Sequence, residues 1–412
     1  MLLTITHLPT QQHQTHTATM ATVIDLVGST STVEHDHEPY DTFQEKALAL
    51  ARLLLGDSGF VAVERMRGGS FNRVIGINVN NQPKYVLRIP RYPNVASVEN
   101  EAAAFLFVLK NAGIAAPVVV TYDAGGDNAI GSPYAVMKLV EGDCLYPHWR
   151  DSSTLPEKLK IAKQAGQTFR QIIETRNKEA GWPAFRQDES GPNAQVHIKA
   201  FKWTAAAPFT TGNRKMVADA EWEPHTPPEF PVSRFMIGVF EAHVKELPDK
   251  VSAGPRLEEH IQTLGRLIKM VKEMDARGVF RDVGYSLFHN DIAPRNIMAY
   301  ARGVEGEASL TFLDWDEVAF MPTFMACKPP KWIWEKDGRD ERDAAEHSKE
   351  RYMAFHNEVG DEFKLFAYNP VYDILREAMT FVIDRTVSTR GTQRKANKIL
   401  AEWEQYVLAN PV

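Results

Sequence analysis

The sequence predicts an α+β protein with a small, strand-rich N-terminal part and a larger, mainly helical C-terminal part. Short apolar runs joined by tight turns fill the chain up to residue 140, and longer apolar patterns at helical spacing follow Gly142. We therefore divide the 412 residues into a tail over 1–40, an N-lobe over 41–140 and a C-lobe over 141–412.

Charge and composition exclude several classes of protein. The chain has 47 basic and 53 acidic side chains, a net charge of -6, which argues against bulk binding to nucleic acid or an anionic membrane surface. No stretch reaches the roughly 18 apolar residues of a membrane span, and the first residues lack a secretory signal pattern. Cys144 and Cys327 lie too far apart for a disulfide framework or zinc ribbon. We expect a cytosolic protein with no nucleic-acid or membrane partner.

The N-lobe elements follow from the spacing of apolar residues. Residues 1–40 are rich in Thr, His and Gln and predict a mobile tail, with Met20 as an alternative start and metal binding by the histidines as the weaker alternative. Apolar residues from Phe43 to Leu54 recur at helical spacing and stop at Gly56. Strands separated by turns, with one helix among them, are expected next, at 61–63, 74–79, 85–90, 97–111 (the helix), near Val118 and at 134–137.

The C-lobe pattern is mainly helical. Thr154 and Glu157 resemble a capping box at the start of a helix. Residues 181–255 hold many prolines and aromatic residues and are expected to form an irregular insertion of the helical, substrate-binding C-lobe, which lines a substrate pocket or belongs to the lobe core. The remaining expected elements are an amphipathic helix over 257–274 ended by Gly278, a β-rich segment over 286–320, and helices over 371–387 and 393–408.

The most informative stretch is LFHNDIAPRNIM at 287–298, followed by LDWD at 313–316. An apolar strand leads to Asp291, and Asn296 follows five positions later, after a Pro-containing loop. A second apolar strand leads to Asp314.

Pairing of these two strands would bring Asn296 and Asp314 to the same end of a hairpin whose turn lies at 302–306. Carboxylate and amide oxygens suit Mg²⁺, and Asp291 just before them could accept or orient the proton of a substrate hydroxyl. Taken alone, each motif also fits an ordinary strand-end turn.

These motifs resemble the aminoglycoside phosphotransferase and choline kinase family of the protein-kinase-like fold, and in particular its fungal members with H-N-D-x-x-P-x-N and D-W-D. The similarity covers roughly Phe60 to Phe320. It implies a two-lobed protein-kinase-like fold that uses ATP and Mg²⁺. It also implies that Asp291 is the catalytic base and that Asn296 and Asp314 are metal ligands.

A glycine turn lies between the first two predicted strands. Gly68 and Gly69 let the backbone approach phosphates closely, and backbone N–H groups with the Ser70 hydroxyl can bind anionic oxygens. A common hairpin turn has the same residues, and the G-x-x-x-x-G-K-[ST] pattern of a Walker loop is absent from the sequence.

The resemblance places Arg88, on the third strand, where kinases carry a lysine that pairs with the nucleotide phosphates. Arginine is always charged and binds phosphate through two donors, so function is retained in principle, although reduced activity is the alternative. Glu101 is the expected helix partner of Arg88, with Glu99 as the second choice and a surface glutamate as the alternative.

The segment 131–142 resembles the connector between kinase lobes. There Met137 would lie behind the adenine, and backbone groups of Lys138 and Val140 would bind it. A register error of one residue, or a purely structural Met137 in the core, is the alternative.

The catalytic stretch departs from the family pattern at several positions. Ala293 replaces a Lys or His, and Arg295 is available near the phosphates or lies on the surface. Asp316 replaces a usual Gly and is either a second carboxylate of the metal site or a surface residue; Glu317 is expected to face solvent or substrate. His289 is expected to pack and hydrogen-bond within the loop.

These observations predict an ATP-dependent phosphotransferase that moves the γ-phosphoryl group to a hydroxyl of a small molecule, assisted by Mg²⁺. The main alternative is a catalytically weak or inactive, pseudokinase-like nucleotide-binding module, suggested by Arg88 and Ala293. A third hypothesis is a hydrolase using Asp291 with Asp314 or Asp316, which would leave the glycine turn and Arg88 unexplained.

Overall fold

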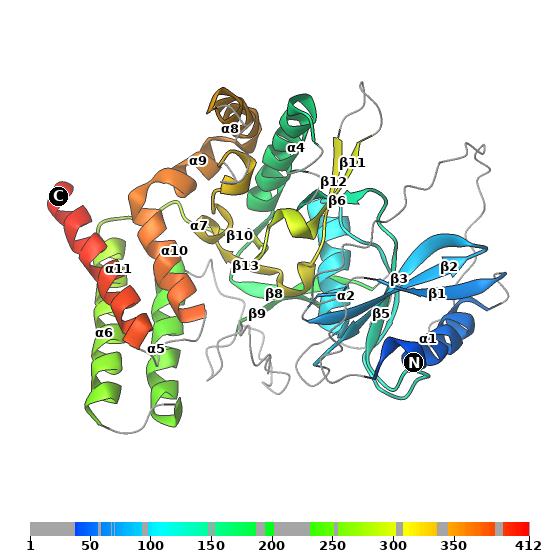
Figure 1. Cartoon of the computed structure of the whole chain (residues 1–412). Helices are drawn as coiled ribbons and strands as arrows, with labels where there is room; N and C mark the ends of the chain where they lie inside the picture. The colour runs from blue at the N-terminus through cyan, green and yellow to red at the C-terminus, as the bar shows by residue number, and fades with distance from the viewer. Residues whose placement is uncertain are drawn as a thin grey trace. The chain divides into compact units, whose positions relative to one another are not determined.

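The structure is a computed structural model, and it forms two compact units that we describe separately (Figure 1). It describes residues 38–56, 59–66, 68–69, 71–92, 98–146, 149, 153–186, 194–201, 231–250, 254–301, 308–335, 345–383 and 390–411. Unit 1 consists of residues up to 102, 118–139 and 190–194, and unit 2 of residues 103–117, 140–189 and 195–412. The predicted tail up to residue 37, Ser70 and the predicted hairpin turn at 302–306 lie outside the described residues. No helix within the described ranges is long and apolar enough to cross a membrane.

Unit 1 contains a five-stranded antiparallel sheet with the order β1-β2-β3-β5-β4. The neighbours Ile75 and Leu87 pair across β2 and β3, as do Val74 and Arg88. Successive side chains on a strand point to opposite faces, so Arg88 lies on the face opposite Leu87. The strand bounds are β1 Val61–Arg65, β2 Asn72–Val79, β3 Gln82–Pro90, β4 Val119–Asp123 and β5 Tyr134–Lys138.

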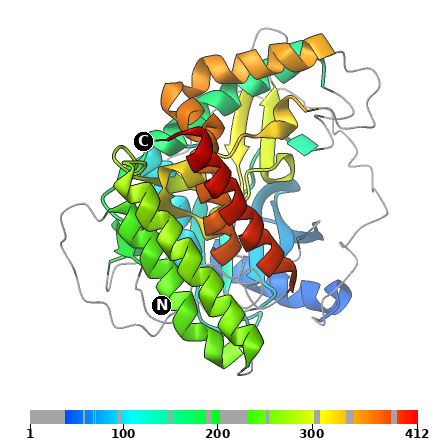
Figure 2. The same cartoon turned by 90° about the vertical axis from the view of Figure 1, so that its left-hand side faces the viewer.

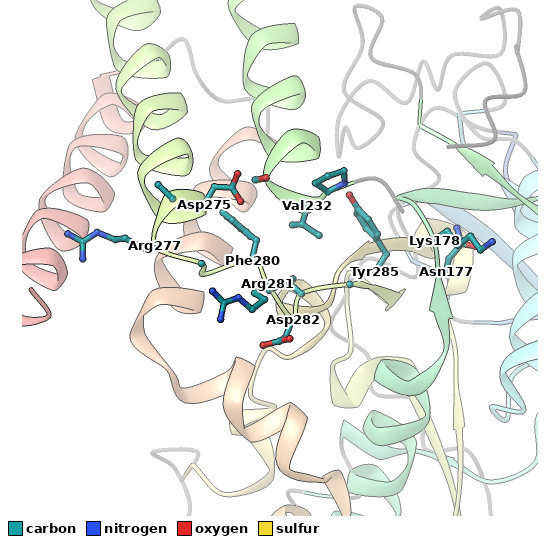
Figure 3. Close-up of a pocket in the computed structure, with 15 residues that line it drawn as sticks. Asn177, Lys178, Val232, Asp275, Arg277, Phe280, Arg281, Asp282 and Tyr285 are labelled. Carbon is teal, nitrogen blue, oxygen red and sulfur yellow. The ribbon is translucent and has the colours of Figure 1, made fainter. Parts of the chain in front are cut away.

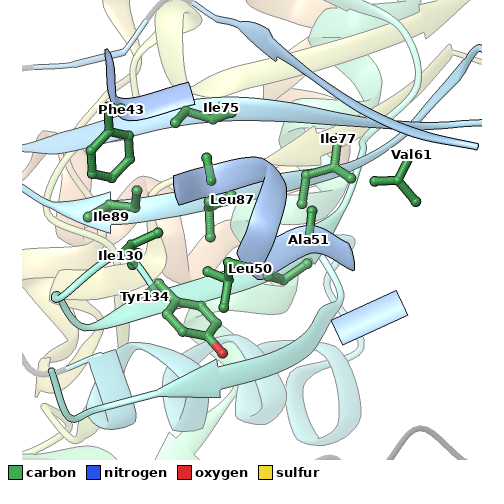
Figure 4. Packing of buried hydrophobic residues seen from close by; sticks show 12 residues of the cluster. Phe43, Leu50, Ala51, Val61, Ile75, Ile77, Leu87, Ile89, Ile130 and Tyr134 are labelled. Atoms are coloured by element: carbon green, nitrogen blue, oxygen red, sulfur yellow. The ribbon is translucent and has the colours of Figure 1, made fainter. Parts of the chain in front are cut away.

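One face of this sheet is covered by α1 (Tyr40–Leu55). Its apolar positions Phe43, Ala47 and Leu50 recur at helical spacing and are buried, as predicted. Figure 4 shows Phe43 and Leu50 of α1 against the inward-facing residues of the strands, Val61, Ile75, Ile77, Leu87 and Ile89. This hydrophobic cluster lies on the face of the sheet opposite to the one that carries Arg88. Glu101, which pairs with Arg88, lies in the first part of α2 (Val98–Phe107). From residue 103 this helix belongs to unit 2, as does the π-helical turn over 108–112 that continues it.

The helices of unit 2 pack mainly in pairs. In α4 (Leu155–Glu174) the predicted capping box is present, and its apolar face packs on α8 (Ala345–Val359). The approach is close at Gly166, where an added Cβ would lie 2.5 Å from the Phe355 carbonyl oxygen. Figure 2 shows α11 alongside the α5–α6 pair. The other helix bounds are α5 Val232–Lys250, α6 Pro255–Ala276, α7 Thr323–Ala326, α9 Asp361–Tyr368, α10 Pro370–Ile383 and α11 Arg390–Ala409.

Two sheets in unit 2 carry the predicted catalytic segments. The first has the order β7-β10-β13-β8-β9 and the second the order β12-β11-β6. In the second sheet, β11 and β12 form an antiparallel hairpin with Ile297 opposite Phe312. The bounds are β6 Asp143–Cys144, β7 Arg176–Asn177, β8 Gly181–Phe185, β9 Val196–Ala200, β10 Tyr285–Phe288, β11 Ile297–Ala301, β12 Ala308–Phe312 and β13 Ala319–Pro322.

The expectation of an irregular insertion over 181–255 is wrong for the parts that the structure describes. Strands β8 and β9 and helix α5 lie within it. The helix buries Val232, Phe235, Met236 and Phe240, which recur three and four residues apart. This helical period was readable in the sequence, but the prolines, aromatic residues and polar turns around it favoured an irregular segment.

Candidate functional site

In unit 2 the chain leaves β10 at Phe288 and enters the predicted catalytic loop through His289. His289 is 7% exposed; its Nδ1 accepts a hydrogen bond from the backbone N–H of Asp291 at 3.1 Å, and its Nε2 lies 2.9 Å from the Leu313 carbonyl oxygen. An acceptor role for Nδ1 makes Nε2 the protonated nitrogen, so the ring joins the loop to the end of β12. Burial lowers the pKa of His289, which keeps the ring neutral. The predicted packing role of this residue is therefore confirmed.

Asp291 is held by the two side chains that follow it in the motif. Arg295 Nη2 lies 2.8 Å from Oδ1 and 2.5 Å from Oδ2 of the carboxylate. Asn296 Nδ2 donates to Oδ2 at 2.9 Å and to the Asp291 carbonyl oxygen at 3.0 Å. Arg295 is exposed and Asp291 half-buried, so solvent screens this ion pair and it adds little to stability. Its importance lies in fixing the direction of the carboxylate.

The hairpin brings Asn296 and Asp314 to the same end, as the sequence predicted. Each lies just beyond the paired strands, and the Leu313 N–H donates to the Asn296 carbonyl oxygen at 2.8 Å. Because the amide nitrogen of Asn296 binds Asp291, its amide oxygen is the atom left to coordinate a cation. One carboxylate and one amide oxygen are hard ligands that fit Mg²⁺, which completes its octahedron with water and phosphate oxygens.

No group of three His, Cys, Asp or Glu side chains arranged for a metal ion occurs among the described residues. A cation here would therefore depend on this pair of oxygens together with water and substrate.

Asp314 has a left-handed backbone, with φ 63° and ψ 46°. This region is costly for most residues, and aspartate and asparagine tolerate it best after glycine. The turn that follows is anchored by the fully buried Trp315, whose indole N–H donates to the Phe312 carbonyl oxygen at 2.8 Å. The Trp315 and His289 rings also meet, with centroids 4.6 Å apart. Trp315, the residue after Asp314, thus holds this turn to the end of β12 and also packs on the catalytic loop.

A hydrogen bond that the sequence did not predict links the two motifs. Asn290 Nδ2 donates to Glu317 Oε2 at 3.0 Å in an exposed position, so Glu317 binds the catalytic loop, and the solvent- or substrate-facing position expected for it stays a prediction. The two residues are 27 positions apart, and only the observed strand pairing makes their contact visible. Asp316 is partly buried beside them, and the metal or surface role suggested for it stays open.

In unit 1, Arg88 and Glu101 form the expected ion pair, with Arg88 Nε 2.9 Å from Glu101 Oε1. Their side chains are 12% and 6% exposed, so the charges are largely removed from water. Asn72, oriented with its amide oxygen toward Arg88, accepts from Nη2 at 2.7 Å and from Nε at 3.0 Å. Removing either partner would leave the other as an unpaired buried charge, which destabilises the fold. The contacts with Glu101 and Asn72 hold the Arg88 charge in one position on this face of the sheet. Asn72 is the first residue of β2, shortly after the glycine turn, and its link to Arg88 was not predicted.

The glycine turn enters β2 from Gly68 and Gly69. A Cβ at Gly68 would lie 2.9 Å from the Asn72 carbonyl oxygen, so a side chain there would collide with backbone. Gly69 has open space around it. Glycine is therefore required at position 68 because the backbone of Asn72 leaves no room for a side chain there.

The connector residues have mixed surroundings. Met137 is buried in β5 opposite Val86, which is compatible with its core alternative. The Lys138 N–H already donates to the Val118 carbonyl oxygen at 2.9 Å. Val140 begins a segment of unit 2. Their predicted contacts with a base stay predictions.

A cavity of about 650 Å³ in unit 2 contains none of the predicted site residues. It lies at the start of β10, near Tyr285. Figure 3 shows Arg277 and Arg281 directed away from Lys178, with Asp275 and Asp282 on different sides. Its charges have both signs and do not converge, which distinguishes it from the arrangement around Asp291.

Comparison with known proteins identifies relatives in fungi. An "altered inheritance of mitochondria protein 9, mitochondrial" of Clavispora lusitaniae is 22% identical over 317 residues, covering 67% of this chain and 51% of the relative. Its counterpart from Komagataella phaffii is 33% identical over 102 residues, covering 22% and 17%. The chain therefore spans about half or less of the length of these relatives. Their names assign them to mitochondria, which does not clearly fit the cytosolic expectation for this chain.

Solved structures with a similar arrangement include kinases of small molecules. The ADP-bound aminoglycoside phosphotransferase APH(2'')-Ib has a TM-score of 0.47 and 11% identity, covering 87% of this chain and 97% of that one. Ethanolamine kinase of Plasmodium vivax has a TM-score of 0.47 and 12% identity, covering 92% and 91%.

The family model described as APH, the phosphotransferase enzyme family, matches residues 62–325, which is more than half of the chain. The antiparallel sheet of unit 1 and the mainly helical unit 2 are the α+β, protein-kinase-like elements that the sequence predicted. The predicted resemblance is thus confirmed, and the chain belongs to the phosphotransferase enzyme family.

Proposed function

We propose that the protein transfers the γ-phosphoryl group of ATP to a hydroxyl of a small molecule with the help of Mg²⁺. The observation that carries this proposal is the pairing of β11 and β12, which brings the oxygens of Asn296 and Asp314 to one end of a hairpin, while Asn296 also holds Asp291. A carboxylate next to two hard metal ligands is what acceptor activation beside a metal-bound phosphate requires.

Each residue has one role in this proposal. Asp291 orients the acceptor hydroxyl and takes its proton at a carboxylate oxygen. Asn296 and Asp314 hold Mg²⁺, which when bound supplies positive charge to the phosphate oxygens. Arg88, fixed by Glu101, contributes a charge that can bind phosphate oxygens.

The contacts of two side chains with Asp291 favour phosphoryl transfer over the hydrolase hypothesis, in which Asp291 acts together with Asp314. Asn296 Nδ2 and Arg295 Nη2 both donate to the carboxylate of Asp291. These contacts engage Asp291 with donors of its own loop, whereas a hydrolase carboxylate pair depends on two carboxyl groups acting together on the substrate.

A catalytically weak nucleotide-binding module is the second candidate. One observation favours it: Arg295 binds both oxygens of Asp291 and so competes with an acceptor hydroxyl for this carboxylate. Substitution of Ala293 for the usual charged residue points the same way.

The test is a screen of metabolite extracts with the full chain, ATP and Mg²⁺, in which mass spectrometry detects compounds that gain one phosphoryl group. Asp314→Asn is the control protein, since it removes the proposed ligand charge. A compound phosphorylated by the wild type alone supports the transferase. Binding of ATP without any phosphorylated compound would favour the second candidate, and absence of ATP binding would refute both.

The choice of metabolite extract depends on where the protein is located in the cell. Cytosolic location stays a prediction, and the relatives carry mitochondrial names. Cell fractionation of the native protein decides which extract to screen first.

A further inference from the structure

Arg295 combines a fixed backbone with a loosely held side chain. It is the middle residue of the 3₁₀ turn Pro294–Asn296, in which the Asn296 N–H donates to the Ala293 carbonyl oxygen at 2.9 Å. The Arg295 carbonyl oxygen accepts a weak hydrogen bond from the Cys144 thiol of strand β6 at 3.6 Å. The side chain of Arg295, in contrast, is 63% exposed. Movement of its guanidinium therefore needs only rotation about side-chain bonds.

The contact of Arg295 with Asp291 uses only part of the guanidinium. Nη2 alone approaches both carboxylate oxygens, at 2.8 and 2.5 Å. The stronger arrangement of arginine with a carboxylate or phosphate uses two parallel N–H groups on different nitrogens. Within the part of the chain that the structure describes, Nε and Nη1 of Arg295 have no hydrogen-bonding partner. Because the pair is also exposed, solvent screens it and little free energy is lost when it opens.

The guanidinium of Arg295 lies next to the proposed cation site. Arg295 Nη2 and Asn296 Nδ2 bind the same atom, Asp291 Oδ2, at 2.5 and 2.9 Å. The amide oxygen of Asn296 is the proposed ligand for Mg²⁺, which prefers to bind phosphate oxygens as well. Transfer to a hydroxyl oriented by Asp291 also requires the γ-phosphoryl group beside that carboxylate. Both requirements bring phosphoryl oxygens to the side chain of Arg295.

We propose that Arg295 binds the γ-phosphoryl oxygens of ATP and releases Asp291 when the nucleotide enters. The inference rests on the proposed function and deepens it. A phosphate group carries more negative charge than one carboxylate and accepts from two guanidinium nitrogens at once, so the exchange of partners is favourable. Asn296 stays bound to Asp291 Oδ2 and keeps the direction of the carboxylate, while Oδ1 becomes available to the acceptor hydroxyl.

The exchange implies that ATP has to bind before the acceptor can use Asp291. In the free protein Arg295 binds both carboxylate oxygens and competes with a hydroxyl for them. With the guanidinium on the phosphoryl group, that competition ends when a phosphoryl donor is present. The charge of arginine persists at any physiological pH, so it also stabilises the negative charge on the phosphoryl oxygens during transfer.

The test is calorimetric titration of the full chain, in the presence of Mg²⁺, with ADP and with the non-hydrolysable β,γ-imido analogue of ATP. Arg295→Gln should weaken binding of the analogue about ten-fold, which is about 1.4 kcal/mol. Binding of ADP should stay within about two-fold, because ADP lacks the γ-phosphoryl group. Arg295→Lys, which keeps the charge on a single donor group, should lie between the wild type and Arg295→Gln. An unchanged preference for the analogue in Arg295→Gln, or equal losses for both nucleotides, would overturn the proposal.

Arg170→Gln is the matched control. Arg170 is 57% exposed on α4 of the same unit and binds Glu174, four residues along the chain, through Nε at 2.8 Å. Arg295 and Asp291 are also four residues apart, so both variants remove one exposed charge and one ion pair of the same kind. Arg170→Gln should keep the wild-type ratio of analogue to ADP affinity. A fall as large as in Arg295→Gln would show that loss of any surface charge produces the effect, and would overturn the proposal.

Phenylglyoxal, which modifies accessible guanidinium groups, gives a second readout that needs no turnover. Mass spectrometry of the peptide that contains Arg295 should show slower modification with the analogue bound than with ADP bound, while modification of Arg170 should be the same with both. Equal protection of Arg295 by the two nucleotides would refute the contact with the γ-phosphoryl group. The two failures remain distinct: a wild type that binds neither nucleotide refutes the proposed function, whereas a preference for the analogue retained in Arg295→Gln refutes only the role of Arg295.

Discussion

Replacement of Asp314 by Asn, Ala and Gly separates its backbone role from its chemical role. All three variants remove the same charge, so differences among them report the left-handed backbone at φ 63°. That conformation costs an ordinary L-residue about 1 kcal/mol or more, is tolerated by asparagine and is free for glycine. Glycine, however, loses roughly 0.5–1 kcal/mol through the greater freedom of the unfolded chain.

We therefore expect Asp314→Ala to be less stable than Asp314→Asn by about 1 kcal/mol, with Asp314→Gly close to Asn. Urea denaturation followed by circular dichroism measures these free energies of unfolding. An alanine variant as stable as the asparagine variant would refute the backbone argument.

The phosphoryl-transfer activities of the three variants should not follow the order of their free energies of unfolding. All three variants lose the proposed metal ligand, so phosphoryl transfer should fall roughly 100-fold or more in each, including the well-folded Asp314→Asn. Calorimetry with Mg²⁺ and ADP should show the same loss of metal binding. Wild-type turnover by Asp314→Asn would refute the assignment of Asp314 as the ligand.

Three further predictions concern the other residues of unit 2. Asp291→Asn should bind ATP like the wild type yet lose transfer, and normal transfer in a product assay would exclude Asp291 as the base. Gly166→Ala should destabilise the protein by about 2 kcal/mol because the new methyl group meets backbone of α8, whereas Gly265→Ala, with open space around it in α6, should stabilise it by up to about 1 kcal/mol; equal melting temperatures would contradict the close packing. Because the pKa of His289 is lowered in the folded protein, the unfolded chain takes up a proton at this residue first as the pH drops below 6.5. The free energy of unfolding, measured by urea denaturation, should therefore fall below pH 6.5 by at most about 1.4 kcal/mol per pH unit. The fall should be smaller in His289→Gln, which lacks the titrating ring.

The hairpin that carries Asn296 and Asp314 was predictable from the sequence. Two apolar strands of similar length separated by a Gly-containing segment allow few pairings, and the polar residues at their outer ends then have to meet. The Arg88–Glu101 pair followed from the family resemblance. The first prediction depends on the order of strands and polar residues along the chain, and the second on the match to the family pattern.

The links among these elements were not predictable in the same way. Arg91 binds Gly69 across 22 residues and Asn290 binds Glu317 across 27, and each contact depends on strand register and on side-chain direction at a loop. The segment that forms helix α5 was expected to be irregular for another reason: its neighbouring prolines were given more weight than the helical spacing of its apolar residues.

The β11–β12 hairpin holds its two chemical residues at one end only, and the paired positions from Ile297 to Ala301 separate that end from the connecting segment. Extra residues inserted between the strands would leave the register, and hence the ligand spacing, unchanged. This connection is therefore the place to attach a fluorescent reporter or an affinity tag without disturbing the two residues at the other end of the hairpin.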